Sequence, residues 1–443
     1  MVRHITIGLG LVVALAGMAQ GQTIIYVDAS ADQTPHDGST WCHAYLELYE
    51  ALAAAGPDTV IRVANGTYLP DSSGLGDPRE ATFQLPNGVT FEGRYGGCND
   101  GGDLRDIELY ETILSGDIGT PDDPNDNCYH VLIGSGTDAS AVVDGFTITG
   151  GHANGPSPDD DGGGMYNDAG SPVVRYCTFS ENYAGGDGGA VFNRDSSPEM
   201  SCCTFTGNSV GDDGGALCNA AGSAATIVNC AFVSNSSSGS GGAVANLSSS
   251  PVLVNCIFSA NTGGTNGGAV FNHSGSPTLT NCTIAANEAN KGGGVYCRLN
   301  SSPTLTNCIL WGDTPQEIYV ESGDPELTYC DVEGGWSGTG NIDADPLFVD
   351  PDDEDLHLQA LSPCIDAGNT MALPGGLYVD LDNGGRVLDD LCTSDTGVPA
   401  SLVPATVDMG AYEFRGILAD LDADGDVDLD DFALFHQQFT GPQ

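Results

Sequence analysis

The residues best suited to chemistry lie near the C-terminus of this 443-residue chain, and they are Asp420, Asp422, Asp424, Asp426, Asp428 and Asp431. Counted from Asp420, they occupy positions 1, 3, 5, 7, 9 and 12 of a loop that has Gly425 at position 6, where the backbone must turn sharply. Calcium takes roughly 6–8 oxygen ligands, and this spacing can supply most of them, with a backbone carbonyl from Asp426 and a direct or water-mediated contact from Asp428. The sequence therefore predicts a Ca²⁺ site at these six aspartates and Ca²⁺ as the cofactor.

A short helix is expected after this loop. Phe432, Phe435 and Phe439 fall on one helical face, at i, i+3 and i+7. The stretch 418–439 resembles one half of a dockerin, with an EF-hand-like loop; full dockerins carry two such units, and this chain carries one. The resemblance implies a cohesin-like or other anchoring partner for residues 416–443. The alternative reading of this segment is an acidic tail without a fold.

Charged residues also recur in two columns in the middle of the chain. One column comprises Asp161, Asp187, Asp213, Ser240, Asn266 and Lys291, and its three carboxylates suggest a second calcium site or a solvated acidic row. The other comprises Asp168, Arg194, Ala220, Leu247, His273 and Arg298. Asp168 and Arg194 would be neighbours, but no second carboxylate stands beside them in this column, as a glycosidase would need. An exposed ion pair worth about 0–1 kcal/mol is the simpler interpretation, so we assign no catalytic and no further cofactor-binding residues.

These columns follow from a repeat over residues 162–313. Six copies pair a GGAVFN-like segment with a CTFSEN-like segment, and the second segments begin at Cys177, Cys203, Cys230, Cys256, Cys282 and Cys308. The separations of 26 or 27 residues are typical of a solenoid. The positions three before and two after each cysteine are apolar in every copy, as is the hydrophobic position of GGAVFN, which runs Met165, Val191, Leu217, Val244, Val270 and Val295.

Strand alternation has a period of two, so buried positions three residues apart require a corner between them. The residue before the cysteine is asparagine in the last four copies, from Asn229 to Asn307, and asparagine tolerates a left-handed bend. We therefore expect three short strands per coil, wound into an all-β, right-handed parallel β-helix. The Gly-Gly pairs and the column Asn182, Asn208, Asn235, Asn261, Asn287 and Asp313 are interpreted as turns.

The paired GGA and FxxN motifs resemble the repeats of polymorphic outer-membrane proteins and related β-helix surface proteins. Farther along, Asp343–Asp350, Leu356–Asn369, the stretch 380–386 (DLDNGGR) and Val407–Phe414 resemble the choice-of-anchor Q region, which closes β-helix proteins and precedes attachment modules. The predicted divisions are a signal peptide at 1–21, an N-terminal cap and first coils at 22–114, the β-helix at 115–350, a C-terminal region at 351–415 and the calcium tail at 416–443. Within the cap, Ala44–Ala55 has helical composition and is expected to cover the first coil.

Composition restricts the remaining possibilities. A formal charge of −50, from 61 acidic and 11 basic residues, disfavours nucleic acid and anionic lipid as partners. Beyond the signal-like start, no stretch is apolar enough for a transmembrane segment. Stacked ladder cysteines would hold their Cβ atoms ~4.8 Å apart, beyond the usual ~3.5–4.5 Å of a disulfide, so we expect six buried free thiols. Cys364 and Cys392 are a candidate disulfide outside the ladder.

Together these features predict an exported, calcium-associated β-helix protein that is secreted or held at the cell surface. Its expected role is binding or structure, with a polysaccharide or another cell-surface ligand as a partner and the tail as an anchor. The alternative is a polysaccharide lyase or glycoside hydrolase on the same scaffold, with a groove built from loops 118–130 and 152–161.

Overall fold

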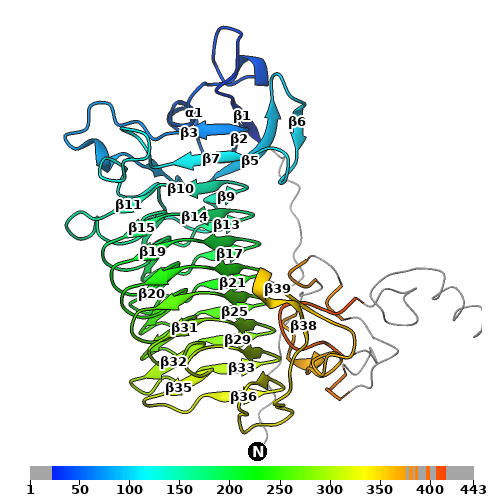
Figure 1. Cartoon of the computed structure of the whole chain (residues 1–443). Coiled ribbons are helices and arrows are strands. Elements are labelled where there is room, and N and C mark those ends of the chain that lie inside the picture. The colour runs from blue at the N-terminus through cyan, green and yellow to red at the C-terminus, as the bar shows by residue number, and fades with distance from the viewer. Residues whose placement is uncertain (1–21, 376–378, 383–384, 388–395, 400–405, 416–443) are drawn as a thin grey trace, which may run out of the picture.

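The computed structural model describes residues 22–375, 379–382, 385–387, 396–399 and 406–415, and the chain forms a parallel β-helix over most of them (Figure 1). The longest sheet has an eleven-strand path, to which β6 (Gly102–Arg105) adds an antiparallel edge at β5. That path runs β1 (Thr23–Val27), β2 (Thr59–Ala64), β5 (Val89–Gly97), β9 (Val142–Asp144), β13 (Val173–Arg175), β17 (Glu199–Ser201), β21 (Thr226–Val228), β25 (Val252–Val254), β29 (Thr278–Thr280), β33 (Thr304–Thr306) and β36 (Glu326–Thr328).

Three further parallel sheets complete the coils. The second contains β3 (Gly66–Tyr68), β7 (Thr112–Ser115), β10 (Thr147–Thr149), β14 (Thr178–Ser180), β18 (Thr204–Thr206), β22 (Ala231–Val233), β26 (Ile257–Ser259), β30 (Thr283–Ala285), β34 (Ile309–Trp311) and β37 (Asp331–Val332). The third contains β11 (His152–Ala153), β15 (Tyr183–Ala184), β19 (Ser209–Val210), β23 (Ser236–Ser237), β27 (Thr262–Gly263) and β31 (Glu288–Ala289). The fourth contains β4 (Phe83–Gln84), β8 (Leu132–Ile133), β12 (Met165–Asp168), β16 (Val191–Arg194), β20 (Leu217–Ala220), β24 (Val244–Leu247), β28 (Val270–His273), β32 (Val295–Arg298) and β35 (Ile318–Val320).

Each regular coil thus has four strands rather than the predicted three. The additional strands, such as β15 and β19, are two residues long and rich in small polar residues, so they leave no alternating hydrophobic signal in the sequence. The predicted corner is confirmed, because the residue before each ladder cysteine is left-handed, with φ of 50–55° in all six copies. This holds for Tyr176 and Cys202 as well as for the four asparagines.

The register places equal positions of successive coils directly above one another. Phe179, Phe205, Phe232 and Phe258 form a continuous stack with ring centroids 4.7–5.1 Å apart and planes within 6° of parallel. The six ladder cysteines are buried beside this stack as free thiols, as predicted. The interior is therefore a set of apolar columns in which every coil is packed by two neighbours.

Two asparagine columns have their side chains inside the helix. The column from Asn182 to Asp313 lies in the turns that follow the second-sheet strands, as predicted, and its side chains are also buried, which was not predicted. The side chain of Asn208, for example, donates to Asn235 Oδ1 at 2.9 Å and to the carbonyl of Phe179 at 2.9 Å. A second ladder runs from Asn167 through Asn193 at 2.9 Å between successive amides. The cost of burying these amides is offset because each one is hydrogen-bonded to the coil above or below.

The N-terminal end of the solenoid is closed by a helix and a disulfide. The helix α1 (Leu48–Ala54) buries Leu48 and Ala51 in the central core, as expected for a cap, but it is shorter than the predicted range 44–55. The shortening has a local cause, because Tyr45 pairs with Val27 as an extension of the sheet, and a 3-10 helix, Trp41–His43, precedes it.

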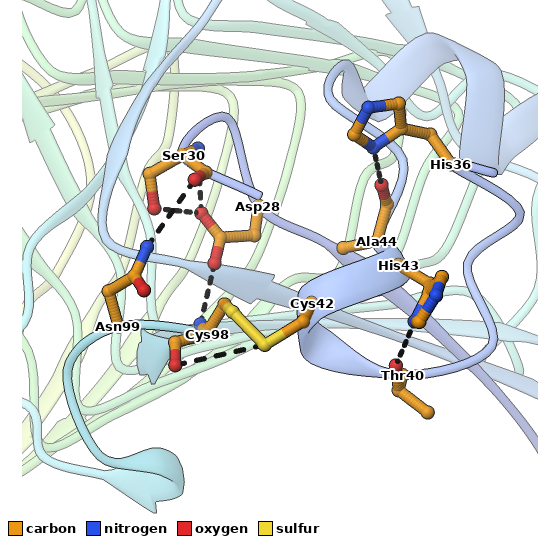
Figure 2. Close-up of a disulfide and its surroundings, with 9 residues drawn as sticks. All are labelled: Asp28, Ser30, His36, Thr40, Cys42, His43, Ala44, Cys98 and Asn99. Atoms are coloured by element: carbon orange, nitrogen blue, oxygen red, sulfur yellow. Dashed lines mark hydrogen bonds between the residues drawn. A yellow bond between two sulfur atoms is a disulfide. The ribbon is translucent and has the colours of Figure 1, made fainter. Parts of the chain in front are cut away.

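The disulfide joins Cys42 to Cys98 across 56 residues (Figure 2). Asp28 lies beside it and accepts hydrogen bonds from the backbone of Cys98 at 2.7 Å and of Ser30 at 2.8 Å. This bond was not predicted, because its two cysteines have no spacing in common with the repeat. Further 3-10 helices are Pro78–Glu80, Pro351–Asp353 and Thr370–Ala372.

After β37 the chain leaves the solenoid and folds back on its flank, where β38 (Phe348–Asp350) and β39 (Asp355–Leu358) form an antiparallel hairpin (Figure 1). Cys364 in this region is a buried free thiol that donates to Asp331 Oδ2 at 3.1 Å. The predicted disulfide between Cys364 and Cys392 is therefore wrong. Cys392 itself lies outside the described residues. The predicted signal peptide at 1–21 and the calcium tail at 416–443 also lie outside them. Within the described part of the chain, no helix has the length and hydropathy to cross a membrane.

Candidate functional site

A row of three carboxyl groups runs along the turns that lead into the fourth sheet. Asp161, Asp187 and Asp213 each precede a Gly-Gly pair, and each follows a strand of the third sheet or its loop. Asp161 Oδ1 accepts the backbone N–H of Asp187 at 2.8 Å, and Asp187 Oδ1 accepts that of Asp213 at 3.1 Å. Asp213 Oδ1 in turn accepts the N–H of Ser240 at 2.7 Å, so one oxygen of every carboxyl fixes the next coil.

These carboxyls are partly buried because the turns fold over a small apolar column on the outer face of the fourth sheet. That column comprises Tyr166, Phe192, Cys218, Ala245, Phe271 and Tyr296. The close approach requires glycine: a Cβ at Gly162, whose φ is 64°, would lie 3.0 Å from the Cβ of Phe192. The carboxyls are therefore partly withdrawn from water.

Burial raises the pKa of Asp161 to about 6 and that of Asp187 to about 7, and it also raises the pKa of Asp213. Neighbouring carboxylates contribute to the increase in the same direction. A carboxyl with a pKa near neutrality can hold a proton at physiological pH and can donate it as a general acid. The row is thus a set of acids, one on each of three successive coils, whose pKa values burial raises.

The calcium hypothesis for this row is not supported. One oxygen of each carboxyl is already used by a backbone N–H of the next coil, and within the described residues no three His, Cys, Asp or Glu side chains are grouped so that they could hold a metal ion. The row is better described as an acidic surface than as a metal centre.

Asp168 and Arg194 are brought together as predicted, with Arg194 Nε donating to Asp168 Oδ1 at 3.2 Å. The hydrogen bond from Arg194 lowers the pKa of Asp168, so this carboxylate stays ionised. Both side chains remain more than a third exposed, so the pair adds little stability. Three and four coils beyond Arg194 in the same column lie His273 and Arg298, and Arg298 donates to His273 Nδ1 at 3.1 Å.

At the N-terminal end of the acidic row, the loops 118–130 and 152–161, which were proposed to form a groove, are both bound by Arg79, a residue that the sequence did not single out. Arg79 donates to the carbonyls of Asn127 and His152, both at 2.7 Å, and its guanidinium lies 4.2 Å from the ring centroid of Tyr129. Arg79 is far from both loops in sequence and lies outside the repeat, so no spacing pointed to it. His130 is buried beside this junction and its Nδ1 lies 3.0 Å from the carbonyl of Gly162; burial lowers the pKa of His130, which favours a neutral imidazole.

The buried asparagine column that begins at Asn182 ends in two acids, Asp313 and Glu317. Asp313 Oδ1 accepts the backbone N–H of Asn287 at 2.7 Å, and Glu317 Oε1 accepts the N–H of Asp313 at 3.0 Å. Both side chains are about 95% buried, and the remaining oxygen of each has no hydrogen-bond partner among the described residues. Burial raises the pKa of both groups, and the negative charge of Asp313 raises that of Glu317 further.

The C-terminal region docks on the corner column that precedes the ladder cysteines. The amide of Asn255 donates to the carbonyl of Val379 at 2.9 Å, and the side-chain oxygen of Asn307 accepts the N–H of Asn369 at 2.7 Å. The carbonyl of Asn307 accepts the N–H of Gly410 at 2.8 Å. The sequence carried a signal for this surface, because the corner changes to asparagine in the last four copies although Tyr176 and Cys202 adopt the same backbone conformation.

The docked region holds a polar cluster around His357. The imidazole lies between two carboxylates, 2.5 Å from Asp355 Oδ1 and 2.7 Å from Asp382 Oδ2, and it stacks on Tyr412 with ring centroids 4.0 Å apart. Burial opposes the charge on His357, but the hydrogen bonds from these carboxylates outweigh it and raise its pKa. Arg415 donates to Asp380 at 2.6 Å, which fixes the last described residue to the body of the protein.

Two of the cavities formed by the described residues lie in the docked region. The smaller one, of about 140 Å³, is lined in part by His357, Asp382 and Arg415. The larger one, of about 360 Å³, lies between Trp311 on the solenoid and Phe348 on the hairpin. The predicted calcium ligands at 420–431 lie outside the described residues, so the structure places neither them nor their distance from these cavities.

Comparison with known proteins agrees with the fold. Residues 188–343 match the family model for a right handed beta helix region, and residues 176–194 match that for the Chlamydia polymorphic membrane protein repeat. The predicted right-handed parallel β-helix with repeats of this kind is therefore confirmed. The resemblances to the choice-of-anchor Q region and to dockerin stay predictions.

Among solved structures, the chain is similar to a pectate lyase, Pel9A, at 15% identity and a TM-score of 0.49, over 89% of this chain and 96% of that one. It is also similar to the pectin methylesterase PemA from Erwinia chrysanthemi, at 12% identity and a TM-score of 0.36, over 73% and 91% of the two chains. A rhamnogalacturonan lyase matches at 10% identity and a TM-score of 0.36, over 74% and 90%. No curated protein sequence gives a significant match.

Proposed function

We propose that this protein is an exported, extracellular β-helix binding protein that is attached through a calcium-loaded C-terminal tail. The rigid solenoid presents the binding surface, and the tail provides attachment to a cohesin-like or other anchoring partner. A polysaccharide or another cell-surface component is the ligand. The signal-like composition of residues 1–21 and the polymorphic-membrane-protein-like repeat support a location outside the cell or at its surface.

The observation that carries this proposal is the docking of the C-terminal region on the asparagine corners. Asn255 and Asn307 hold two distant parts of this region, and Arg386 is completely buried while donating to the carbonyl of Gly410 at 2.5 Å. The segment that precedes the tail is therefore an integral part of the body. A tail that follows Arg415 would start from a residue that donates a hydrogen bond to Asp380 of the body.

Calcium is assigned to the tail by the chemistry of its donors. The carboxylates of Asp420, Asp422, Asp424, Asp428 and Asp431 and the carbonyl of Asp426 are the hard oxygen ligands that calcium prefers. When bound, the ion would supply the charge that allows these carboxylates to approach one another. The residues themselves would then bring the Phe432 face into a defined position for a partner.

Limited proteolysis of the intact protein tests this proposal. We expect millimolar calcium to protect residues 420–439 from cleavage, and we expect Asp420→Ala combined with Asp424→Ala to abolish that protection. Asp352→Ala combined with Asp353→Ala provides a matched control, because it removes two exposed aspartates from the docked region. If calcium leaves cleavage of the tail unchanged in the parent protein, the calcium-dependent attachment is wrong.

A carbohydrate-active enzyme is the second candidate, and one observation favours it. Asp161 and Asp187 are neighbouring carboxyls with pKa values raised to about 6 and about 7, the range in which a general acid of a glycosidase operates. Release of products from a polysaccharide by the parent protein, lost in Asp187→Asn, would support this candidate over a binding role.

A further inference from the structure

The larger cavity on the flank results from a change in side-chain size between two coils. Ala285 and Trp311 are paired in register at the ends of β30 and β34, so a small side chain lies directly next to the indole. The hairpin of β38 and β39 covers the space from the other side with Leu347, Phe348 and Pro351. The result is a cavity of about 360 Å³, which is within the size range of small-ligand sites.

The hairpin wall is held in place by its own hydrogen bonds. Gln359 donates its backbone N–H to the carbonyl of Leu347 at 2.8 Å and its side-chain amide to the carbonyl of Phe348 at 2.7 Å. Asp345 Oδ1 accepts the N–H of Leu347 at 2.9 Å. Phe348 is 7% exposed and packs with Ala285 and Ile309, so the cavity exists before any ligand arrives.

The cavity combines apolar walls with unused polar atoms. Among the described residues, the indole N–H of Trp311, the second carboxylate oxygen of Asp345 and the side-chain oxygen of Gln359 have no hydrogen-bond partner. A ligand that suits these groups needs one apolar face to lie on the indole and several hydroxyl groups at its edge. Hydroxyls can donate to Asp345 and Gln359 and can accept from the indole N–H.

The negative charge of the protein restricts the class of ligand further. Among the described residues that line the cavity, Asp345 is the one that carries a charge, and the whole chain has a formal charge of −50. An anionic ligand would meet an unfavourable potential at this surface, whereas a neutral ligand would not. A sugar ring has the required combination of an apolar C–H face, hydroxyl groups and no charge.

We propose that this cavity binds one ring of a neutral saccharide, with Trp311 as the stacking surface and Asp345 as the principal hydroxyl acceptor. This inference names a ligand class for the binding role proposed above and rests on that role for its biological setting. It does not depend on the calcium tail, so it can be tested in calcium-free buffer. Absence of saccharide binding at the cavity and absence of calcium-dependent attachment are then separate outcomes.

The test is calorimetric and fluorescence titration of the full-length protein with cellohexaose, xylohexaose and mannohexaose, and with an oligogalacturonate as the anionic comparison. We expect at least one neutral hexasaccharide to bind and to change tryptophan emission. Binding should weaken at least tenfold in Trp311→Ala and in Asp345→Asn. It should be unchanged in Trp336→Phe, because Trp336 packs against the main core and does not line the cavity.

Three results would overturn the proposal. The first is the absence of binding to all three neutral hexasaccharides, and the second is a preference for the oligogalacturonate. The third is binding that both Trp311→Ala and Asp345→Asn leave intact. Asp345→Asn keeps the shape of the side chain, so it tests the cavity even if removal of the indole disturbs the hairpin.

Discussion

Replacing Asp187 by asparagine is expected to stabilise the coils at alkaline pH and to have a much smaller effect at acidic pH. The folded protein raises the pKa of this carboxyl from its usual 3.8 to about 7. Between these two values the folded chain binds more protons than the unfolded chain, so stability falls as the pH rises through this window. Above pH 7 the carboxylate is ionised in both states, and the full cost of its burial remains.

The size of the effect follows from the same shift. A difference of about three pKa units corresponds to at most ~4 kcal/mol at high pH. Asp187 keeps part of its surface in water, and its charge is shared with the neighbouring carboxyls of the row, so we reduce this figure to about 2 kcal/mol. Asparagine has no charge to bury and keeps an oxygen that can accept the N–H of Asp213. The variant should therefore be about 2 kcal/mol more stable at pH 8, and the advantage should fall below about 1 kcal/mol at pH 5.

Urea unfolding followed by circular dichroism at pH 5 and pH 8 measures this difference, with the disulfide intact. Asp212→Asn is the matched control, because it removes the same formal charge from an exposed position next to the row. Equal stability of parent and Asp187→Asn at pH 8 would refute the reasoning. So would an equal gain from Asp212→Asn, because the benefit would then come from the general charge of the protein and not from burial.

Three further predictions address the core, the thiols and the docked region. Phe232→Ala should cost about 3–5 kcal/mol in denaturant unfolding, because the ring is fully buried between two stacked phenylalanines; a change near zero would mean that the ring is not packed as described. Thiol labelling of the unfolded, unreduced protein should modify the ladder cysteines and leave Cys42 and Cys98 unmodified; disulfide links between ladder neighbours would contradict the packing. Asn307→Ala should increase proteolysis of the C-terminal region while the coils stay resistant, because its side chain accepts the N–H of Asn369; equal resistance in parent and variant would argue against docking at the corners.

The period of the repeat was enough to predict the solenoid, its inward apolar columns and its left-handed corners, because each of these is a property of one coil repeated many times. The strands of the third sheet were missed because two residues are too short to show alternation. The column from Asn182 to Asp313 was correctly placed in turns, because asparagine is common there, but the burial of its side chains was missed, since only the stacked geometry shows that the amides are hydrogen-bonded to one another.

Contacts between distant segments could not be predicted from the sequence. The bond between Cys42 and Cys98 depends on how the capping segment crosses the first coils. Arg79 joins two loops that lie about 50 and 70 residues away from it, and nothing in the repeat points to it. The pKa values of Asp161 and Asp187 depend on the turns that fold over an apolar column, although their regular spacing was visible. The asparagine corners carried a signal for docking, but their partners became identifiable only in the structure.

A single measurement tests most directly whether this protein binds without catalysis. The purified full-length protein would be incubated with a panel of insoluble and soluble polysaccharides in calcium-containing buffer, and retention and released products would be quantified in the same samples. We predict retention on at least one neutral polysaccharide, with no new reducing ends and no unsaturated products. Release of such products by the parent protein, and its loss in Asp187→Asn or Asp168→Ala, would contradict the account and identify an enzyme.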